Sequence, residues 1–446
     1  MPTAWRTTLA RRLPFYYGWV VFGLASSTSY TSRPLMSVAV LSVFVVPMTE
    51  AFGWSRGLFS GAVSLGGLCA VAVSPMIGRL VDKYGSGVTI SVGSAVAGAC
   101  ALGLSLIQQA WAFYALYIPG RMAFASPLEL ATTTAISNWF IRRRAFALAL
   151  FGVTQGTGLA AMPLVAQWLI NRWEWRHAWA LLGLYTLAVG IVPPVVFMVR
   201  RPEDIGLEPD SACASHSVSA RHLPPGVIDS TAAQRPSRHQ ETHFTLQEAL
   251  HTRAFWVLSA FSAVGFMVQA GVSLHQVSHY IHQGLTRPSA AIMASVFAFA
   301  QVPAGLLWSM LTRRLSIRVL LALSGLSVAL GAFGIALSSA LVSGIVVSST
   351  LGVGVSGLHF LLRLAWANYY GRQYLGTIRG VTLPIQIGGQ ALGPVIAGMV
   401  FDSTGGYYHA FVFFAAAVAL ASFLVLTAVP PSSAATQISE GAVRTE

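Results

Sequence analysis

The chain has 446 residues, of which 55% are hydrophobic and only 9% carry a charged side chain. A soluble domain carries about 25% charged residues, so this composition excludes a water-covered globular surface and predicts a chain that lies in lipid. The formal net charge of +13 does not indicate nucleic acid, because the basic residues form short clusters between apolar runs. The three cysteines give no disulfide framework.

Apolar runs of membrane-spanning length follow one another along the chain. About 20 apolar residues in a helix cross the roughly 30 Å hydrocarbon core, and twelve runs satisfy this condition. The expected spans 1 to 12 are 16–40, 56–78, 88–107, 111–137, 146–170, 177–199, 254–280, 289–311, 317–337, 341–366, 376–400 and 408–428. The basic N-terminus lacks a short apolar region with a cleavage site, so we expect span 1 to be uncleaved.

A polar segment separates span 6 from span 7. Residues 200–253 are rich in Ser, Pro, Arg and His, which is typical of a partly disordered linker. Thr245 and Glu248 have the spacing of a capping box that begins a short surface helix.

An internal repeat divides the chain at the same place. Asn138-Trp139-Phe140 reappears as Asn368-Tyr369-Tyr370, and Pro163 reappears as Pro394. We therefore expect an N-terminal six-helix bundle over 1–199, a cytoplasmic linker over 200–253, and a C-terminal six-helix bundle with a short tail over 254–446.

Basic residues gather in the loops on one side of the predicted membrane. By the positive-inside rule, that side is cytoplasmic, with both termini and the linker, in a plasma or inner membrane. The residues on that side are Arg6, Arg11, Arg12, Arg79, Lys83, Arg142, Arg143, Arg144, Arg200, Arg201, Arg221, Arg235, Arg238, Arg253, Arg313, Arg314, Arg318, Arg372 and Arg379; the opposite side has Arg56, Arg172, Arg176 and Arg287.

Six ionisable side chains lie deep within the apolar spans. A charge at mid-bilayer costs roughly 2.5–3.5 kcal/mol, so such a residue is kept for a partner, a wet cavity or a ligand. The six are Arg33 (span 1), Arg121 and Glu129 (span 4), His275 (span 7), and His359 and Arg363 (span 10). Mid-membrane polar groups in a repeated chain favour a secondary transporter.

The loop after span 2 carries a recognisable motif. Residues 78–85, with Gly78, Asp82 and Lys83, resemble the cytoplasmic loop motif of the major facilitator superfamily, although Ser86 and Gly87 replace its two final basic residues. Further segments resemble the bacterial monocarboxylate porters and oxalate–formate antiporters of that superfamily. These are residues 17–21, 139–144, 175–176, 201–210 and 393–407.

The resemblance implies the major facilitator fold, an all-α membrane protein with twelve transmembrane helices in two pseudo-symmetric six-helix bundles. In that fold spans 1, 4, 7 and 10 line a central cavity, which would bring the six ionisable residues together. It also implies that Asp82 caps a neighbouring helix and latches the outward-open state. The implied cytoplasmic gate consists of Gly78, Asp82, Lys83, Arg142, Arg143 and Arg144. Ser309 stands at the position that corresponds to Asp82 in the second half, so we expect one latch of this kind.

One departure from the resemblance concerns span 8. Porters of this type usually carry an Asp/Arg pair there, and 289–311 contains no acidic or basic residue. The usual anion site is therefore missing or moved.

The candidate substrate residues are mainly arginines. The planar fork of Arg121 suits a carboxylate, and the alternative is an ion pair with a neighbouring helix. Arg33, in the outer half of span 1 before Pro34, is a second anion candidate. Arg363 shares a helical face with His359 and is a further candidate, but it lies near the cytoplasmic end, where it would alternatively extend to water.

Glu129 is the first candidate for proton coupling, followed by His359, because both groups can titrate in a cavity of intermediate polarity. The alternatives are a static salt bridge and a packing histidine. His275, His279 and His282 share one face of span 7, but no acidic or cysteine partner is near in sequence, so we expect no metal there. We place His275 at a wet helix end, facing substrate.

These features predict a proton-coupled carrier, a symporter, of a small organic anion that alternates access around a central site. We expect it to be a monomer in the lipid bilayer, without a cofactor and without nucleic acid. An exporter of amphipathic or cationic compounds, with Glu129 as the cation site, is an alternative, as is a non-transporting sensor or scaffold. An enzyme is not expected, since no phosphate loop, metal-ligand cluster or nucleophile–base pattern is evident.

Overall fold

The computed structural model describes residues 4–54, 56–210 and 243–431. Within these ranges the regular elements are helices. In the first half they are α1 (Ala4–Arg12), α2 (Gly18–Tyr30), α3 (Ser32–Leu35), α4 (Val38–Phe52), α5 (Arg56–Tyr84), α6 (Ser86–Leu104), α7 (Ala110–Ala125), α8 (Pro127–Trp139), α9 (Arg144–Gly190), α10 (Val192–Phe197) and the 3₁₀ helix η1 (Pro202–Ile205). In the second half they are α12 (Leu246–Leu250), α13 (Arg253–His282), α14 (Arg287–Leu311), α15 (Ile317–Leu337), α16 (Leu341–Tyr370), α17 (Leu375–Thr404) and α18 (Tyr408–Val425).

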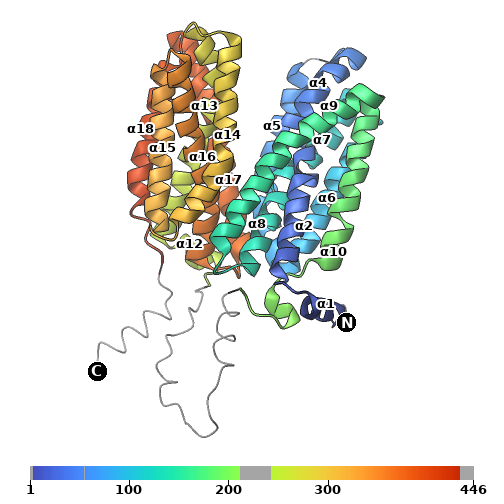
Figure 1. The fold of residues 1–446 in the computed structure, drawn as a ribbon. Helices are drawn as coiled ribbons and strands as arrows, with labels where there is room; N and C mark the ends of the chain where they lie inside the picture. The colour runs from blue at the N-terminus through green and yellow to red at the C-terminus, as the bar shows by residue number, and fades with distance from the viewer. Residues whose placement is uncertain (1–3, 55, 211–242, 432–446) are drawn as a thin grey trace, which may run out of the picture.

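The twelve predicted spans are all helical. Ten segments of the described chain are individually long and apolar enough to cross a membrane. One of them contains two predicted spans, because α9 loses helical geometry at Trp173 and Glu174 and the chain turns back there (Figure 1). Span 4 is divided at Ser126 into α7 and α8, each shorter than a membrane-crossing helix.

Span 1 extends further than predicted. It continues through α2, α3 and α4 to Phe52, whereas the sequence placed its end at residue 40. Pro34 cannot donate a backbone hydrogen bond, and the helix is interrupted around it instead of ending there. Ser37 then restarts the helix by accepting the Val40 N–H at 3.1 Å. Arg33 consequently lies at the middle of span 1 and not in its outer half.

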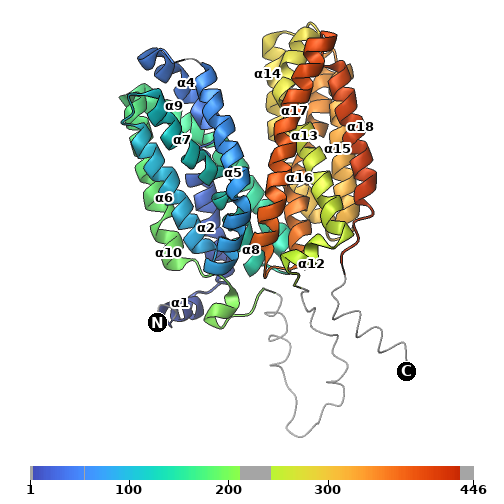
Figure 2. The same ribbon diagram turned by 180° about the vertical axis from the view of Figure 1, so that it is seen from behind.

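The helices form two bundles that stand side by side (Figures 1 and 2). Helices α2 to α10 belong to one and α13 to α18 to the other. Helix α1 and the C-terminal end of α18 lie at the same end of the molecule, which we call the inner end. The division at 1–199, 200–253 and 254–446 stays a prediction, and residues 211–242 of that linker lie outside the described residues.

The end of the linker forms the predicted capping box. Thr245 Oγ1 accepts the Glu248 N–H, and a Glu248 carboxylate oxygen accepts the Thr245 N–H at 2.7 Å. This backbone hydrogen bond lowers the pKa of Glu248. Helix α12 therefore starts at a fixed place beside the C-terminal bundle.

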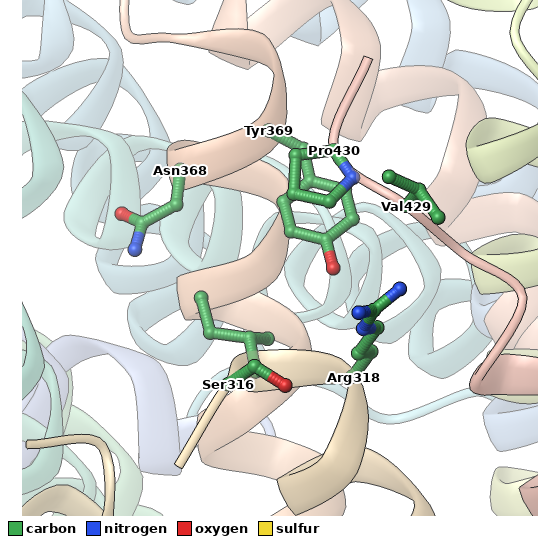
Figure 3. A pocket seen from close by; sticks show the side chains of 7 residues that line it. Ser316, Arg318, Asn368, Tyr369, Val429 and Pro430 are labelled. Carbon is green, nitrogen blue, oxygen red and sulfur yellow. The ribbon is translucent and has the colours of Figure 1, made fainter. Parts of the chain in front are cut away.

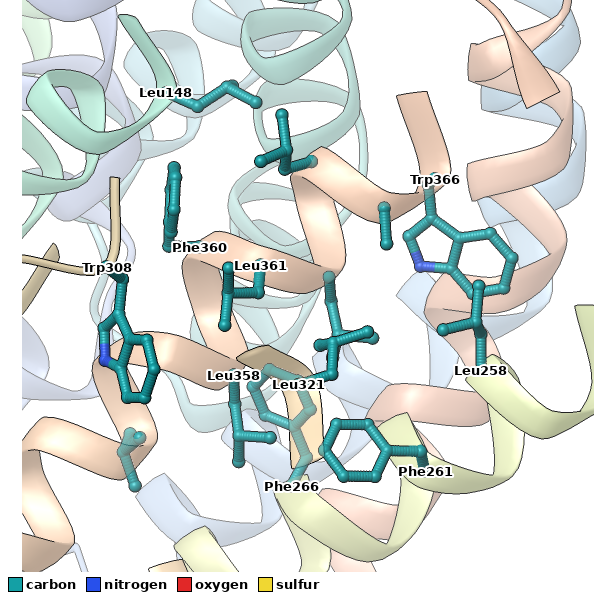
Figure 4. Packing of buried hydrophobic residues seen from close by; sticks show 14 of the residues in the cluster. Leu148, Leu258, Phe261, Phe266, Trp308, Leu321, Leu358, Phe360, Leu361 and Trp366 are labelled. Carbon is teal, nitrogen blue, oxygen red and sulfur yellow. The ribbon is translucent and has the colours of Figure 1, made fainter. Parts of the chain in front are cut away.

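Large apolar side chains fill the C-terminal bundle around α16. Leu358 and Trp366 of α16 pack with Phe261 and Phe266 of α13 and with Leu321 of α15 (Figure 4). The two bundles approach most closely where glycines meet. A Cβ placed on Gly78 of α5 would lie 2.2 Å from the Gly376 carbonyl oxygen of α17. Small residues at such a crossing let backbones come into direct contact.

Candidate functional site

A single buried carboxylate joins the two bundles near the middle of the membrane-spanning region. Glu129 is only 7% exposed. Its Oε2 lies 3.2 Å from Arg33 Nη2, and its Oε1 lies 2.9 Å from Arg363 Nη2. Gln155 Nε2 also donates a hydrogen bond to Oε2 at 3.1 Å. Because Arg363 belongs to α16 and the other partners to the N-terminal bundle, the carboxylate connects the halves.

The break in span 4 places Glu129 favourably. Helix α8 begins at Pro127, which suits a first helical position because it needs no N–H donor. Glu129 is the third residue of this helix, so its carboxylate lies near the positive end of the helix dipole.

Two further arginines are neighbours of the ion-paired residues, Arg379 of Glu129 and Arg121 of Arg33. Arg379, the fifth residue of α17, is 5% exposed and close enough to interact electrostatically with Glu129 and Arg363. Arg121 donates to the Met36 carbonyl oxygen at 3.3 Å. Together these residues form what we call the central charge cluster. It comprises Arg33, Arg121, Glu129, Arg363 and Arg379.

An aromatic ring supports the outer arginines of the cluster. The guanidinium carbons of Arg121 and Arg33 lie 4.4 Å and 4.7 Å from the centroid of Phe124. Such contacts attract a cation to the ring face without neutralising it. The charge of Arg121 thus remains available to an anion, whereas that of Arg33 is paired with Glu129.

Two expectations about arginines were wrong. Arg379 was assigned to a cytoplasmic loop, and Arg144 was expected in water; both are buried, at 5% and 3% exposure. Arg379 lies inside the apolar run that follows Arg372, and this position in the sequence could have indicated that its side chain is buried. Arg363 does not extend to water, because it is ion-paired with Glu129.

The predicted histidines lie in two different places. His359 packs edge-on against Phe266, with ring centroids 4.7 Å apart, and interacts electrostatically with Glu129 and Arg363. His275 instead stacks on Tyr407 at 4.9 Å and contacts the Pro394 carbonyl oxygen at 3.3 Å. The structure therefore brings together five of the six predicted residues and leaves His275 outside the cluster.

The predicted gate loop has the expected capping geometry. Asp82 Oδ1 accepts the Gly376 N–H at 3.0 Å and Oδ2 accepts the Thr377 N–H at 2.6 Å, at the start of α17. A carboxylate at a helix N-terminus satisfies donors that have no partner within the helix. Lys83 is exposed and lies 5.1 Å from the Tyr84 ring centroid.

A second set of contacts crosses the inner end. Arg144 Nη1 donates to Asn368 Oδ1 at 2.9 Å and to the Ala367 carbonyl at 3.2 Å. In the other direction, Arg372 Nη1 donates to the Asn138 carbonyl at 2.8 Å. Each half thus supplies an arginine to the end of a helix of the other half, which the sequence did not predict.

The neighbouring loop is held by the segment after span 6. The backbone N–H groups of Ile141, Arg142 and Arg143 donate to the Asp210 carboxylate at 2.6–2.9 Å. Arg142 and Arg143 themselves are exposed. The Asp82, Arg144 and Arg372 contacts all lie on the inner side of Glu129, so the structure has the two bundles joined at the inner end.

A separate pocket of about 400 Å³ opens at the inner end of the C-terminal bundle (Figure 3). Ser316, Arg318, Asn368, Tyr369 and Pro430 contribute to its lining. It contains none of the predicted site residues and is distinct from the central charge cluster.

Comparisons of the sequence with known proteins all indicate the same protein family. The model of the Major Facilitator Superfamily matches residues 28–386. Monocarboxylate transporter 2 of Mus musculus is 23% identical over 407 residues, covering 89% of this chain and 80% of that protein. An uncharacterized MFS-type transporter of Bacillus subtilis, YcxA, is 25% identical over 160 residues, which span 36% of this chain and 39% of its own length.

The fold also matches solved structures. The transporter FucP, crystallised in an outward conformation, aligns with a TM-score of 0.66 at 15% identity, covering 93% of this chain and all of that one. At this level of identity the likeness shows the fold alone, in agreement with the predicted twelve-helix arrangement.

Proposed function

Because this chain belongs to the Major Facilitator Superfamily, we propose that it is a secondary active transporter of a small organic anion, with its substrate site at the central charge cluster. The observation that carries this proposal is the imbalance of buried charge. Three arginines, Arg33, Arg363 and Arg379, interact with the one carboxylate of the cluster. A fourth arginine, Arg121, shares the Phe124 ring with Arg33.

This imbalance favours an anion over a cation. Buried charges without compensation are costly, and a bound anion would compensate the excess arginines. Guanidinium groups hold carboxylates by two parallel hydrogen bonds, so a carboxylate is the best-matched ligand. The name of the mouse relative, a monocarboxylate transporter, supports the same class.

In the C-terminal bundle, the arginines near Glu129 lie on other helices than span 8, where similar porters carry their charged pair. Helix α14 has no ionisable side chain between Ser289 and Leu311. Arg363 on α16 and Arg379 on α17 lie beside Glu129 instead. In this proposal they replace the Asp/Arg pair that similar porters carry in span 8.

Transport would proceed by rocking of the bundles around the cluster. Opening the inner end requires breaking the contacts of Asp82, Arg144 and Arg372, while the Glu129–Arg363 ion pair must rearrange. Protonation of Glu129 would remove the charge that holds Arg33 and Arg363, and would free both arginines for substrate. Glu129 is thus the proposed proton-coupling group, and His359 is the second candidate because it lies beside the same pair.

The orientation and setting complete the proposal. By the positive-inside rule, the basic residues of the inner end support a cytoplasmic location for both termini and the linker. The protein would act as a monomer in a plasma or inner membrane.

Uptake into proteoliposomes tests the proposal. We expect purified protein to accumulate a labelled carboxylate, faster when the outside is acidic, and we expect Arg121→Gln to reduce this uptake at least several-fold. Movement of organic cations alone would instead favour an exporter of cationic compounds. A protein that binds and moves neither class would be a sensor or scaffold.

A further inference from the structure

The arginines of the central charge cluster are not equally compensated. Arg33 and Arg363 share the carboxylate of Glu129. Arg121 reaches only the Met36 carbonyl oxygen among the described residues, and its Nε is buried without a hydrogen-bond partner there. Arg379 makes no ion pair or hydrogen bond with the described part of the chain, although it is 5% exposed. Two guanidinium groups therefore lack an anionic partner.

These two groups have different neighbours in the central charge cluster. Arg121, on α7 of the N-terminal bundle, shares the Phe124 ring with Arg33. Arg379, on α17 of the C-terminal bundle, interacts electrostatically with Arg363 and Glu129. The pairwise contacts thus lead in a row from Arg121 through Arg33, Glu129 and Arg363 to Arg379, and the two uncompensated arginines at the ends of this row belong to different bundles.

We propose that the transported anion is a dianion with two separated anionic groups, one held by Arg121 and the other by Arg379. This inference rests on the proposed function, since it names the class of anion that the same site takes. A dicarboxylate whose carbon chain is long enough to pass Glu129 fits the row. It would also connect the two bundles across the site.

The physical reason is the cost of a buried charge without a partner, which is several kcal/mol per ion. A monoanion could pair with Arg121 or with Arg379 and would leave the other uncompensated. Two anionic groups on one molecule pair with both arginines, and the second group binds without a further loss of translational freedom.

The Arg121 end has an additional hydrogen-bond donor. Tyr117 is fully buried, and its hydroxyl has no hydrogen-bond partner among the described residues. It is close enough to Arg121 to interact with it electrostatically. A carboxylate bound by Arg121 would therefore find a hydroxyl donor as well as a guanidinium.

The test compares matched mono- and dicarboxylates on the full-length purified protein. Calorimetry would measure the affinity and stoichiometry of butyrate, pentanoate and hexanoate against succinate, glutarate and adipate. We expect at least one dicarboxylate to bind about tenfold or more tightly than the monocarboxylate of equal length, with one molecule per chain. We expect Arg121→Gln and Arg379→Gln each to remove that advantage while monocarboxylate binding persists.

Two controls keep the result interpretable. Arg314→Gln, an exposed arginine at the inner end, should leave both affinities unchanged. Arg379→Gln should raise the melting temperature of the ligand-free protein, because it removes an uncompensated buried charge. This second readout shows that the variant folds.

The outcomes separate the two proposals. Equal affinity for mono- and dicarboxylates, or two monocarboxylates bound per chain, would overturn the dianion inference and leave an organic-anion carrier. Binding of organic cations with no carboxylate bound at all would overturn the proposed function itself.

Discussion

Glu129 makes ion pairs or hydrogen bonds with side chains on three different spans, so its charge affects both bundles at once. Arg33 and Arg363 depend on it for compensation, and Arg363 is its partner across the bundle interface. A change at this residue should therefore affect coupling, stability and the contact between halves together.

Glu129→Gln should abolish the acceleration of uptake by an inward proton gradient. It should also lower the melting temperature, because removing one partner of a buried ion pair typically costs about 3–5 kcal/mol. Uptake at two external pH values and thermal unfolding in detergent would measure these effects. Glu50→Gln, at an exposed glutamate near the outer end of α4, is the matched control. If pH-driven uptake survived in Glu129→Gln, proton coupling would have to be assigned elsewhere.

The sequence identified the members of the site better than their partners. Arg33, Arg121 and Glu129 are conspicuous because charged residues are rare in long apolar runs. Arg379 was missed because it lies only a few residues from a polar loop, where an arginine ordinarily reaches water. The pairing of Glu129 with Arg33 and Arg363 could not be predicted, because it depends on helix breaks and on which faces the two bundles present to each other.

At the scale of helices, the contact between α5 and α17 depends on glycine. The Gly78 Cα lies so close to α17 that any side chain would collide with the Gly376 backbone. Asp82, one turn further along α5, caps the same end of α17. The close approach and the cap therefore support one arrangement, in which the inner end is joined.

Gly78→Ala should shift the protein away from this joined arrangement, since its Cβ would lie 2.2 Å from a carbonyl oxygen. Spin labels at exposed positions Val88 and Arg313, in a background without the native cysteines, should report a longer distance across the inner end. Gly67→Ala on the same helix is the control, because a Cβ there meets no atom within 4 Å. An unchanged distance distribution in Gly78→Ala would contradict this role of the glycine.

The length of an apolar run predicts that a membrane span exists, but it does not predict where the helix within that span is interrupted. The number of spans follows from hydrophobicity, since every backbone polar group in lipid must be paired within a helix. A kink at Pro34 is expected because proline lacks an N–H donor, whereas the interruption at Ser126 does not change hydrophobicity and was not predicted. Both interruptions adjoin the central charge cluster, where non-helical backbone can be buried in protein.

For the whole molecule, the inner end is closed by contacts in both directions between the bundles. Arg144 and Arg372 each donate hydrogen bonds to the end of a helix in the opposite half. Hydrogen bonds from charged donors contribute about 1.5–3 kcal/mol each, so these two arginines have a substantial effect on how often the inner end opens.

Arg372→Gln should therefore increase the fraction of molecules with a separated inner end and should weaken substrate binding from the outer side. The same pair of spin labels and an outside-facing binding assay would measure the two effects. Arg314→Gln, at an exposed arginine in a nearby loop, should change neither. Tighter binding from the outer side in Arg372→Gln would show that this contact does not hold the joined state.

The contacts that Arg144 and Arg372 each make with the opposite half have a further consequence for assembly. Asn138 and Asn368 are equivalent positions of the internal repeat, and each lies where an arginine of the other half binds. The contact resembles that of a twofold-symmetric dimer whose two subunits have been fused into one polypeptide, although Arg144 and Arg372 do not stand at equivalent positions of the repeat. In such an arrangement the connecting segment raises the effective concentration of the halves but does not create the surface by which they recognise each other.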